Sequence, residues 1–302
     1  MRINLWRSVF VVPVLMSGLA FTTSGHGQEK ASADLTFGTA TEGRAYWQLA
    51  KRLEAVAISE GLKVKVLATQ GAVENLERLA DPEDAMNIAL TQADVLQHYL
   101  GDNPGLLASK TEILEPIGLE CVFVVASTNG DIASEKDWQS AVAPRIAIQA
   151  EGSGSAKTHS FMGRLVPELA DDVVVYMNTA DAINALYAEG EDRVDLVFVV
   201  YRPKYNSPEV RAALDQPDRF RLLPIEDSRL QSKLPTGEDV YEFLDIPLTR
   251  QLSGGLRTVR TVCTRGLLLT DPNKVDPLAR RKLQKVIEYH WGQIYPELDT
   301  RL

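Results

Sequence analysis

Residues 62–76 read LKVKVLATQGAVENL, and this stretch contains the repeating unit of the fold. Leu62, Val64 and Val66 alternate with lysines, and this period of two predicts a β-strand. After Gly71 the apolar residues recur at helical spacing, so the turn around this glycine joins a strand to a helix. A strand, a glycine-containing turn and a helix in this order are typical of α/β proteins with parallel strands.

The same order of elements continues on both sides of this stretch. Residues 35–38 predict a strand, and residues 46–56 carry apolar side chains at helical spacing after a turn from Gly38 to Gly43. Residues 86–90 predict a third strand. The β-α-β-α-β order implies parallel strands with right-handed crossovers and helices on both faces of the sheet.

A second α/β series begins after residues 117–126, a nearly continuous apolar run that predicts a buried strand. Residues 220–225 predict the strand that leads back, so this series is inserted into the first. The predicted strands of the series cover 145–149, 173–177 and 194–200, and its predicted helices cover 155–166, 180–188 and the residues after Ser207 and Pro208. The tail adds a predicted strand at 258–270 and a final helix capped by Asp276 and Pro277.

Length and composition indicate two lobes. A chain of 302 residues with 45% hydrophobic residues can bury a large core and exceeds the usual size of one domain. We therefore predict an α/β fold with a first lobe at 28–128 and 225–302 and an inserted second lobe at 129–224.

The first 27 residues have the pattern of a secretory signal peptide. Arg2 and Arg7 precede an apolar stretch at 9–21, and small and polar residues follow. The apolar stretch is short for a bilayer span, although a retained membrane anchor stays an alternative. Cleavage after Ala20 or after Gly27 would both fit, and either predicts an exported protein.

The charge of the chain excludes some partners. The formal net charge is −9, and removal of the leader would take away two arginines and make the chain more acidic. Nucleic acids and anionic lipids are therefore not expected partners. If an acidic protein binds an anion, it must concentrate positive potential locally, which draws attention to helix N-termini and to Arg44.

The two cysteines, Cys121 and Cys263, lie in strand-like runs and could face each other on neighbouring strands. In an oxidising compartment such a pair can form a disulfide. Two separate buried thiols remain the alternative, because free cysteine is often a core residue.

Three glycine-rich turns, at 38–43, 69–76 and 152–155, each precede a predicted helix. Such turns direct backbone N–H groups and the positive end of a helix dipole toward a ligand, so each is a candidate anion site. The third, Gly152-Ser153-Gly154-Ser155, is not a P-loop, because Ala156 replaces the glycine required before Lys157. It also lacks the spacing of a dinucleotide fingerprint or a serine-hydrolase elbow. An ordinary capped turn is the alternative to a ligand site.

Several side chains near these turns are candidates for ligand contact. Arg44 could pair with a carboxylate or with Glu42, and Tyr46 could contact a ligand or belong to the core. Asn75 and Gln92 lie where open α/β sheets present ligand groups, although either could cap a backbone. The predicted ligand-binding residues are Thr39, Thr41, Arg44, Tyr46, Asn75, Gln92, Ser153, Gly154, Ser155, Asn178 and Tyr201.

Two further side chains are assigned other roles. Asp94 is expected to be the N-cap of the helix after the third strand, with ligand contact as the alternative. Of the neighbours Tyr201 and Arg202, we expect Tyr201 to contact the ligand and Arg202 to face solvent beside Pro203.

The sequence offers no catalytic or metal-binding pattern. His159 lies one helical turn from Ser155, but the sequence places no acid to orient it as a base, so a hydrolase is the less favoured alternative. No zinc spacing and no paired-carboxylate signature is present. We predict a protein that is not an enzyme, with no cofactor and no metal.

From residue 35 to the C-terminus the chain resembles the TAXI family, the extracytoplasmic solute receptors of a class of TRAP transporters. The segments that carry the resemblance are Gly43 with Tyr46, residues 71–76, Gln92-Ala93-Asp94, residues 152–155, Asp195-Leu196-Val197-Phe198, Leu223-Pro224-Ile225 and Asp245-Ile246-Pro247. The chain departs from the family at Arg44 and Ala45, where small residues are usual, at Gln70-Gly71-Ala72, where Gly-Gly-Ser is usual, and at Ser155, where threonine is usual.

The resemblance implies a two-lobed type II periplasmic binding protein that closes on a small organic anion or amino acid, glutamate-like in the better-understood members. It also implies delivery to a TRAP membrane permease, with the ligand in the cleft between the lobes. We expect a monomer. An ABC-type or sensor-coupled receptor for an uncharged ligand is the alternative.

Overall fold

The computed structural model describes residues 34–103, 111–203, 207–233, 237, 239–249 and 256–295. The predicted leader and its cleavage site lie outside these residues. Within them, no helix has both the length and the apolar character that a membrane span requires.

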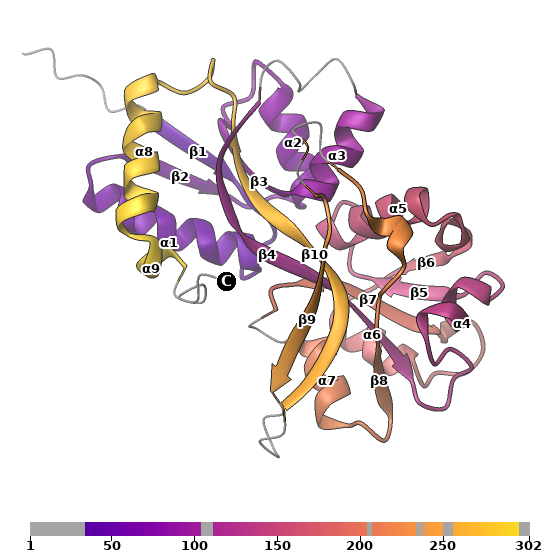
Figure 1. The fold of residues 1–302 in the computed structure, drawn as a ribbon. Helices are drawn as coiled ribbons and strands as arrows, with labels where there is room; N and C mark the ends of the chain where they lie inside the picture. The colour runs from indigo at the N-terminus through magenta and orange to yellow at the C-terminus, as the bar shows by residue number, and fades with distance from the viewer. Residues whose placement is uncertain are drawn as a thin grey trace, which may run out of the picture. The chain divides into compact units, whose positions relative to one another are not determined.

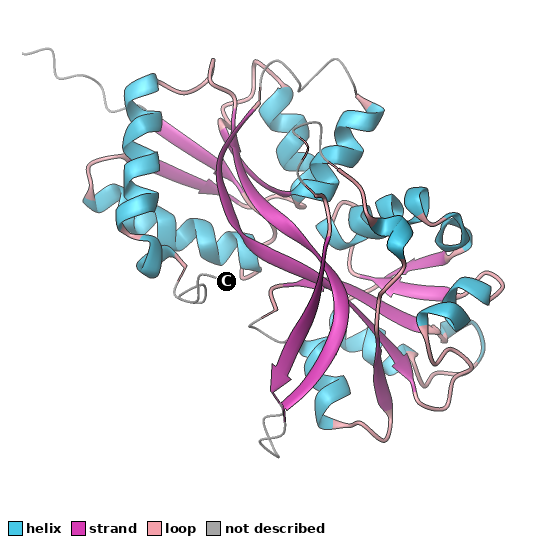
Figure 2. Ribbon diagram, in the orientation of Figure 1, coloured by secondary structure: helices cyan, strands magenta, loops and turns pink. Residues whose placement is uncertain are grey.

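The described residues form one mixed sheet with helices on both faces (Figures 1 and 2). The strand order is β2-β1-β3-β10-β4-β7-β5-β6, with β8 paired to β4 and β9 paired to β10. The strands are β1 (Asp34–Gly38), β2 (Lys63–Leu67), β3 (Ile88–Gln92), β4 (Glu112–Ser127), β5 (Arg145–Ile148), β6 (Val173–Tyr176), β7 (Leu196–Tyr201), β8 (Phe220–Leu223), β9 (Glu242–Thr249) and β10 (Leu256–Thr270).

The helices alternate with the strands along both halves of the sheet. They are α1 (Ala45–Ser59), α2 (Ala72–Ala80), α3 (Ala93–Asp102), α4 (Glu135–Ser140), α5 (Gly154–Leu165), α6 (Thr179–Ala185), α7 (Pro208–Asp215), α8 (Pro277–Tyr289) and α9 (Trp291–Ile294). We call β1–β3 with α1–α3 and α8 the first half, and β5–β8 with α4–α7 the second half.

The long strands β4 and β10 belong to both halves (Figure 1). The N-terminal part of β4 pairs with β10, and from Cys121 onward β4 pairs with β7. Similarly, β10 pairs with β9 up to Cys263 and with β3 from Gly266 onward. Cys121 and Cys263 are register partners, so they mark the place where both strands change neighbours.

Alternation along the strands divides the core between the two faces of the sheet. Leu35 and Phe37 of β1 pack with α1 and α8 in one core cluster. Along β4, Val122 and Val124 join a cluster with α2, α3 and α5, whereas Phe123 joins a third cluster on the opposite face. Helices on both faces and parallel pairing of β1 with β2 and β3 confirm the predicted α/β class.

Two elements and one cap were not anticipated from the sequence. The short helix α4 and the strand β9 lie in segments that the prediction left without structure. The prediction that Asp94 caps the following helix is wrong, because Gln92 is the N-cap of α3 and Asp94 lies inside the first turn. The boundaries of the predicted lobes remain a prediction.

Candidate functional site

The three glycine-rich turns lie close together. The Asn75 amide donates to the backbone oxygen of Thr39 at 2.7 Å, which ties the second turn to the first. A methyl group built on Gly71 would lie 3.2 Å from the carbonyl oxygen of Gly152, so the second turn touches the third. The turns of the two halves therefore meet at one place.

Gln92 and Gly154 form a second contact between the halves. A methyl group on Gly154 would lie 2.0 Å from Oε1 of Gln92, so this side chain reaches the backbone of α5 only because residue 154 is glycine. Gln92 ends β3 and Gly154 begins α5. This contact joins a strand end of the first half to a helix N-terminus of the second.

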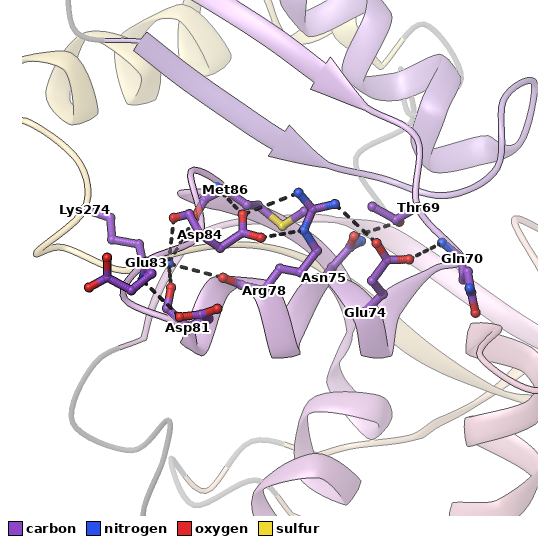
Figure 3. Close-up of polar contacts among 10 residues, drawn as sticks. All are labelled: Thr69, Gln70, Glu74, Asn75, Arg78, Asp81, Glu83, Asp84, Met86 and Lys274. Carbon is purple, nitrogen blue, oxygen red and sulfur yellow. Dashed lines mark hydrogen bonds and ion pairs between the residues drawn. The ribbon is translucent and has the colours of Figure 1, made fainter.

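Hydrogen bonds to side chains of α2 fix the Gln70–Gly71 turn (Figure 3). Thr69 Oγ1 donates to the Asn75 side chain at 2.8 Å, and the backbone N–H of Gln70 donates to Glu74 at 2.7 Å. Arg78 then pairs with Glu74 at 3.2 Å and with Asp84 at 2.9 Å. Because Glu74 accepts from this turn, the N-terminus of α2 already has a carboxylate of its own, which disfavours a second anion there.

The Lys274 ammonium group holds the other end of α2 (Figure 3). It donates to the backbone oxygens of Arg78 at 3.2 Å, of Asp84 at 3.3 Å and of Met86 at 3.3 Å, and also to that of Asp81. A lysine near a helix C-terminus interacts favourably with the dipole. The helix that carries Asn75 is thus fixed at both ends.

The Gly71→Ala substitution should destabilise the protein. Gly71 has φ +135°, a backbone conformation that side chains rarely adopt, and the added methyl group would press on the Gly152 carbonyl. We expect a loss of about 1–3 kcal/mol in the free energy of unfolding, measured by urea titration.

The matched control is Gly152→Ala, in the facing turn. Its added methyl group would lie 3.5 Å from the Gln70 side chain, an ordinary contact, and Gly152 has no positive φ. An equal loss from both substitutions would show that the backbone of Gly71 is not under this constraint.

The N-terminus of α5 is capped by a serine and differs from that of α2. Ser153 is the N-cap, and its side chain accepts from the Ala156 N–H at 3.2 Å. The first turn has no acidic residue, unlike that of α2. Ser155 is buried, and its hydroxyl accepts from the Val200 N–H at 3.0 Å, so it joins α5 to β7.

A buried polar cluster lies next to these turns, and we call Tyr46, Gln92, Glu120 and Arg202 the Glu120 cluster. Gln92 Nε2 donates to Glu120 at 2.9 Å, and the Tyr46 hydroxyl donates to the Thr91 carbonyl at 2.8 Å. Burial raises the pKa of Glu120, and the nearby Arg202 guanidinium partly offsets the rise. Burial and the neighbouring Glu120 also raise the pKa of Tyr46.

Glycine at position 266 lets Ile117 pack closely against β10 beside this cluster. Gly266 pairs with Gln92 in the sheet, and a methyl group there would lie 2.8 Å from Ile117 and 3.4 Å from Glu120. A side chain on β10 at this position would therefore clash with Ile117 and lie in contact with Glu120.

A second buried carboxyl connects three segments, and we call Asp94, Thr158 and Tyr241 the Asp94 junction. Asp94 Oδ2 accepts from Thr158 Oγ1 at 2.6 Å and from the Tyr241 hydroxyl at 2.9 Å. Its other oxygen accepts from the Val95 N–H at 2.8 Å. Burial raises the pKa of Asp94, although these hydrogen bonds oppose the rise. The junction links α3 of the first half to α5 of the second.

The remaining predicted residues differ in burial and in their contacts. Thr39 is buried, and its hydroxyl donates to the Leu67 carbonyl at 2.8 Å, whereas Thr41 is exposed. The Arg44 guanidinium is half-buried and makes no hydrogen bond or ion pair with the described residues, so the alternative pairing with Glu42 does not occur there. Asn178 is exposed and caps α6 through the Asp181 N–H at 3.1 Å.

The expectation that Arg202 faces solvent is wrong, whereas ligand contact by Tyr201 stays a prediction. Tyr201 is the register partner of Cys121 and packs in the core cluster on the opposite face from Val200. Arg202 is only 6% exposed and interacts with Glu120, so it does not face solvent. Alternation along β7 explains why Arg202 is buried. Neighbouring side chains point to opposite faces of the sheet, so Tyr201 and Arg202 lie on different faces.

The statement that no acid orients His159 is also wrong. His159 Nε2 lies 2.7 Å from Oδ2 of Asp172, and the Trp138 indole donates to the same carboxylate at 3.2 Å. His159 is thereby engaged with Asp172, while the Ser155 hydroxyl is bonded to β7. The described hydrogen bonds therefore contain no Ser155–His159 pair of nucleophile and base.

Cys121 and Cys263 are joined by a disulfide with an S–S distance of 2.00 Å. They face each other on neighbouring strands, so the disulfide is formed and the alternative of two separate buried thiols is wrong. Among the described residues, no group of three or more histidine, cysteine, aspartate or glutamate side chains could hold a metal ion.

Two cavities lie away from this site. One, of about 360 Å³, lies beside α5 and is lined by His159, Arg164, Asp172 and Tyr176. The other, of about 190 Å³, lies near Asp131 and Arg193. None of the predicted ligand-binding residues lines either of these two cavities.

Comparisons with known proteins identify the fold. MatC from Rhodopseudomonas palustris, solved with bound malate, matches with a TM-score of 0.54 at 17% identity over 88% of this chain and 87% of that chain. A protein from Bordetella bronchiseptica matches with a TM-score of 0.51 at 15% identity over 87% and 75%. The fold is that of a two-lobed periplasmic binding protein. A TctC solute binding protein from Polaromonas is similar at a TM-score of 0.48, with 11% identity over 88% and 87%.

The fold alone does not select a ligand. No protein family profile and no curated protein matches the chain. By contrast, 710 chains of solved structures match it, so the architecture is widespread.

Proposed function

We propose that the chain is an exported solute-binding receptor of the TAXI type, which captures a small organic anion or amino acid and delivers it to a TRAP transporter permease. One observation carries the proposal: Gly71 meets Gly152, and Gln92 meets Gly154, where the two halves of the fold come together. A ligand at this place contacts both halves at once. It therefore stabilises the closed arrangement and shifts the population toward it.

The N-terminus of α5 is the proposed seat of the ligand carboxylate, with Ser153, Gly154 and Ser155 around it. Arg44 supplies a positive charge that no described residue neutralises, which suits an anion on an acidic protein. Tyr46 and Gln92 are proposed to line the same place from the first half. Direct ligand contact stays a prediction for Thr39, Thr41, Asn75, Asn178 and Tyr201.

The test begins with native mass spectrometry of freshly purified protein, followed by a melting screen. The screen contains amino acids, monocarboxylates and dicarboxylates, malate among them. A ligand at a hundredfold excess over its Kd should add about 2.7 kcal/mol to the free energy of unfolding, which is readily seen as a higher Tm.

Two arginine variants sharpen the result. Arg44→Ala should weaken the binding of an anionic ligand about tenfold or more, because a charge-assisted hydrogen bond is lost. Arg281→Ala, on the exposed side of α8, should leave the affinity unchanged. A protein whose Tm no small molecule raises would contradict the receptor function.

A further inference from the structure

The two halves contact each other directly, through pairs of their own residues. The pairs are Gly71 with Gly152, Gln92 with Gly154, Asp94 with Thr158 and Asp102 with Arg164. Between α3 and α5, Thr158 donates to Asp94 at 2.6 Å, and Arg164 Nη2 donates to both carboxylate oxygens of Asp102, at 2.8 and 2.9 Å. The chain itself therefore stabilises the closed arrangement of its halves.

Gln92 fills the space over the first residue of α5. A methyl group built on Gly154 would lie 2.0 Å from Oε1 of Gln92, 2.7 Å from Cδ and 2.7 Å from Nε2. The whole amide group thus covers this glycine, and Gln92 is only 3% exposed. A ligand atom placed over Gly154 would meet the same three atoms, so a ligand and the Gln92 amide cannot both lie there.

The Gln92 amide also resembles a ligand in its charge. Its oxygen Oε1 carries a partial negative charge and lies beside the positive end of the α5 dipole. Oε1 has no hydrogen-bond partner in the described structure, so no hydrogen bond to the helix is lost when it leaves. A carboxylate carries a full charge and accepts stronger hydrogen bonds, so it can displace the amide.

Only the side chain of Gln92 has to move. The residue ends β3, pairs with Gly266 of β10 and is the N-cap of α3, so its backbone is fixed. Its Nε2 donates to Glu120 at 2.9 Å, and this bond directs Oε1 toward α5. Rotation of one side chain therefore uncovers Gly154 without rearrangement of the sheet.

We propose that Gln92 is an internal competitor of the ligand, whose amide occupies the seat over Gly154 until a ligand displaces it. The inference rests on the proposed receptor function and adds a regulation of the same site. Molecules in which Gln92 covers Gly154 do not bind, so only a fraction of the population is competent. The apparent Kd is then the intrinsic Kd divided by that fraction.

The Gln92→Ala variant tests this role, because a competitor and a ligand contact predict opposite changes in affinity. If Gln92 competes, its removal should tighten binding about tenfold, since the competent state is no longer a minor one. If Gln92 were only a ligand contact, its removal would weaken binding. Calorimetry compares the variant with the wild type, with L-glutamate, L-malate and the other compounds of the melting screen as probes.

Two further variants serve as controls. Gln139→Ala removes a glutamine whose Nε2 also donates to a carboxylate, that of Asp227, at 2.9 Å. This residue lies on α4, which contains none of the proposed ligand contacts, so the affinity should stay unchanged. Gln92→Asn keeps an amide and removes one methylene group, so it is the milder change at the same position. It should also tighten binding, because the shorter side chain no longer covers Gly154.

The outcomes separate the two proposals. Equal or weaker binding by Gln92→Ala and Gln92→Asn would overturn the competitor role and leave the receptor function standing. The same gain in Gln139→Ala would overturn it too, because the gain would not depend on the contact with Gly154. If no compound of the screen binds the wild type or either Gln92 variant, both proposals are overturned.

Discussion

Removal of the Cys121–Cys263 disulfide is expected to lower the free energy of unfolding by up to about 5 kcal/mol. The two cysteines are 142 residues apart in sequence, and the entropy of closing so long a loop in the unfolded chain gives this figure. The native bond joins register partners of β4 and β10 in the core, so its loss should leave the folded arrangement intact. Urea titration of the Cys121→Ala, Cys263→Ala double variant measures the change.

Reduced wild-type protein is the control for this result. It retains both buried sulfur atoms, so the difference between it and the double variant reports packing rather than the covalent link. Thiol titration should count two accessible thiols after unfolding in reductant and none without it. An unchanged midpoint after complete reduction would contradict the prediction.

Asp94→Ala should lower the free energy of unfolding by about 2–6 kcal/mol. The substitution leaves the buried hydroxyl groups of Thr158 and Tyr241 without an acceptor, and each orphaned group costs about 1–3 kcal/mol. Because these donors come from different segments, the loss should also weaken the contact between α3 and α5. Equilibrium unfolding followed by tryptophan fluorescence provides the measurement.

Single-donor variants serve as controls for the Asp94 junction. Thr158→Val and Tyr241→Phe each remove one donor and keep the shape of the side chain, so each should cost less than Asp94→Ala, about 1.5–3 kcal/mol. Asp94→Asn retains an acceptor and should lie between wild type and Asp94→Ala. A larger loss from either single-donor variant would contradict the central role of the carboxyl group.

The elements of the fold could be predicted because local patterns specify them. The change from a period of two to helical spacing at Gly71 corresponds to the end of β2 and the start of α2. Ser207 with Pro208 and Asp276 with Pro277 begin α7 and α8 as their capping patterns predicted. By contrast, β9 pairs with β10 through a register that no local pattern reveals.

The site could be predicted only in part, because its chemistry depends on contacts between distant segments. The three glycine-rich turns each follow a predicted strand, and this common position at strand ends made it possible to predict that they lie close together. Glu120 was hidden inside an apolar strand, and only the alternation of Cys121 and Val122 between opposite faces indicates the side to which it points. The sequence signal that could have found Arg202 is the same alternation, counted from Val200.

The partner of His159 illustrates a different limit. Asp172 lies after a short 3-10 helix, Pro167–Asp171, that follows α5 and returns the chain toward it. The backbone path of this connection, rather than sequence spacing, brings the carboxylate within 2.7 Å of the imidazole. Spacing within one helix could not predict it.

The disulfide also has a consequence for proteolysis. The whole second half of the fold lies between Cys121 and Cys263, so it is enclosed in a covalent ring. A single cut by a protease at any exposed turn of this ring would produce two polypeptides that stay tethered through sulfur. Fragments would separate on a gel only after reduction, and a nicked molecule would retain all the segments that form its core.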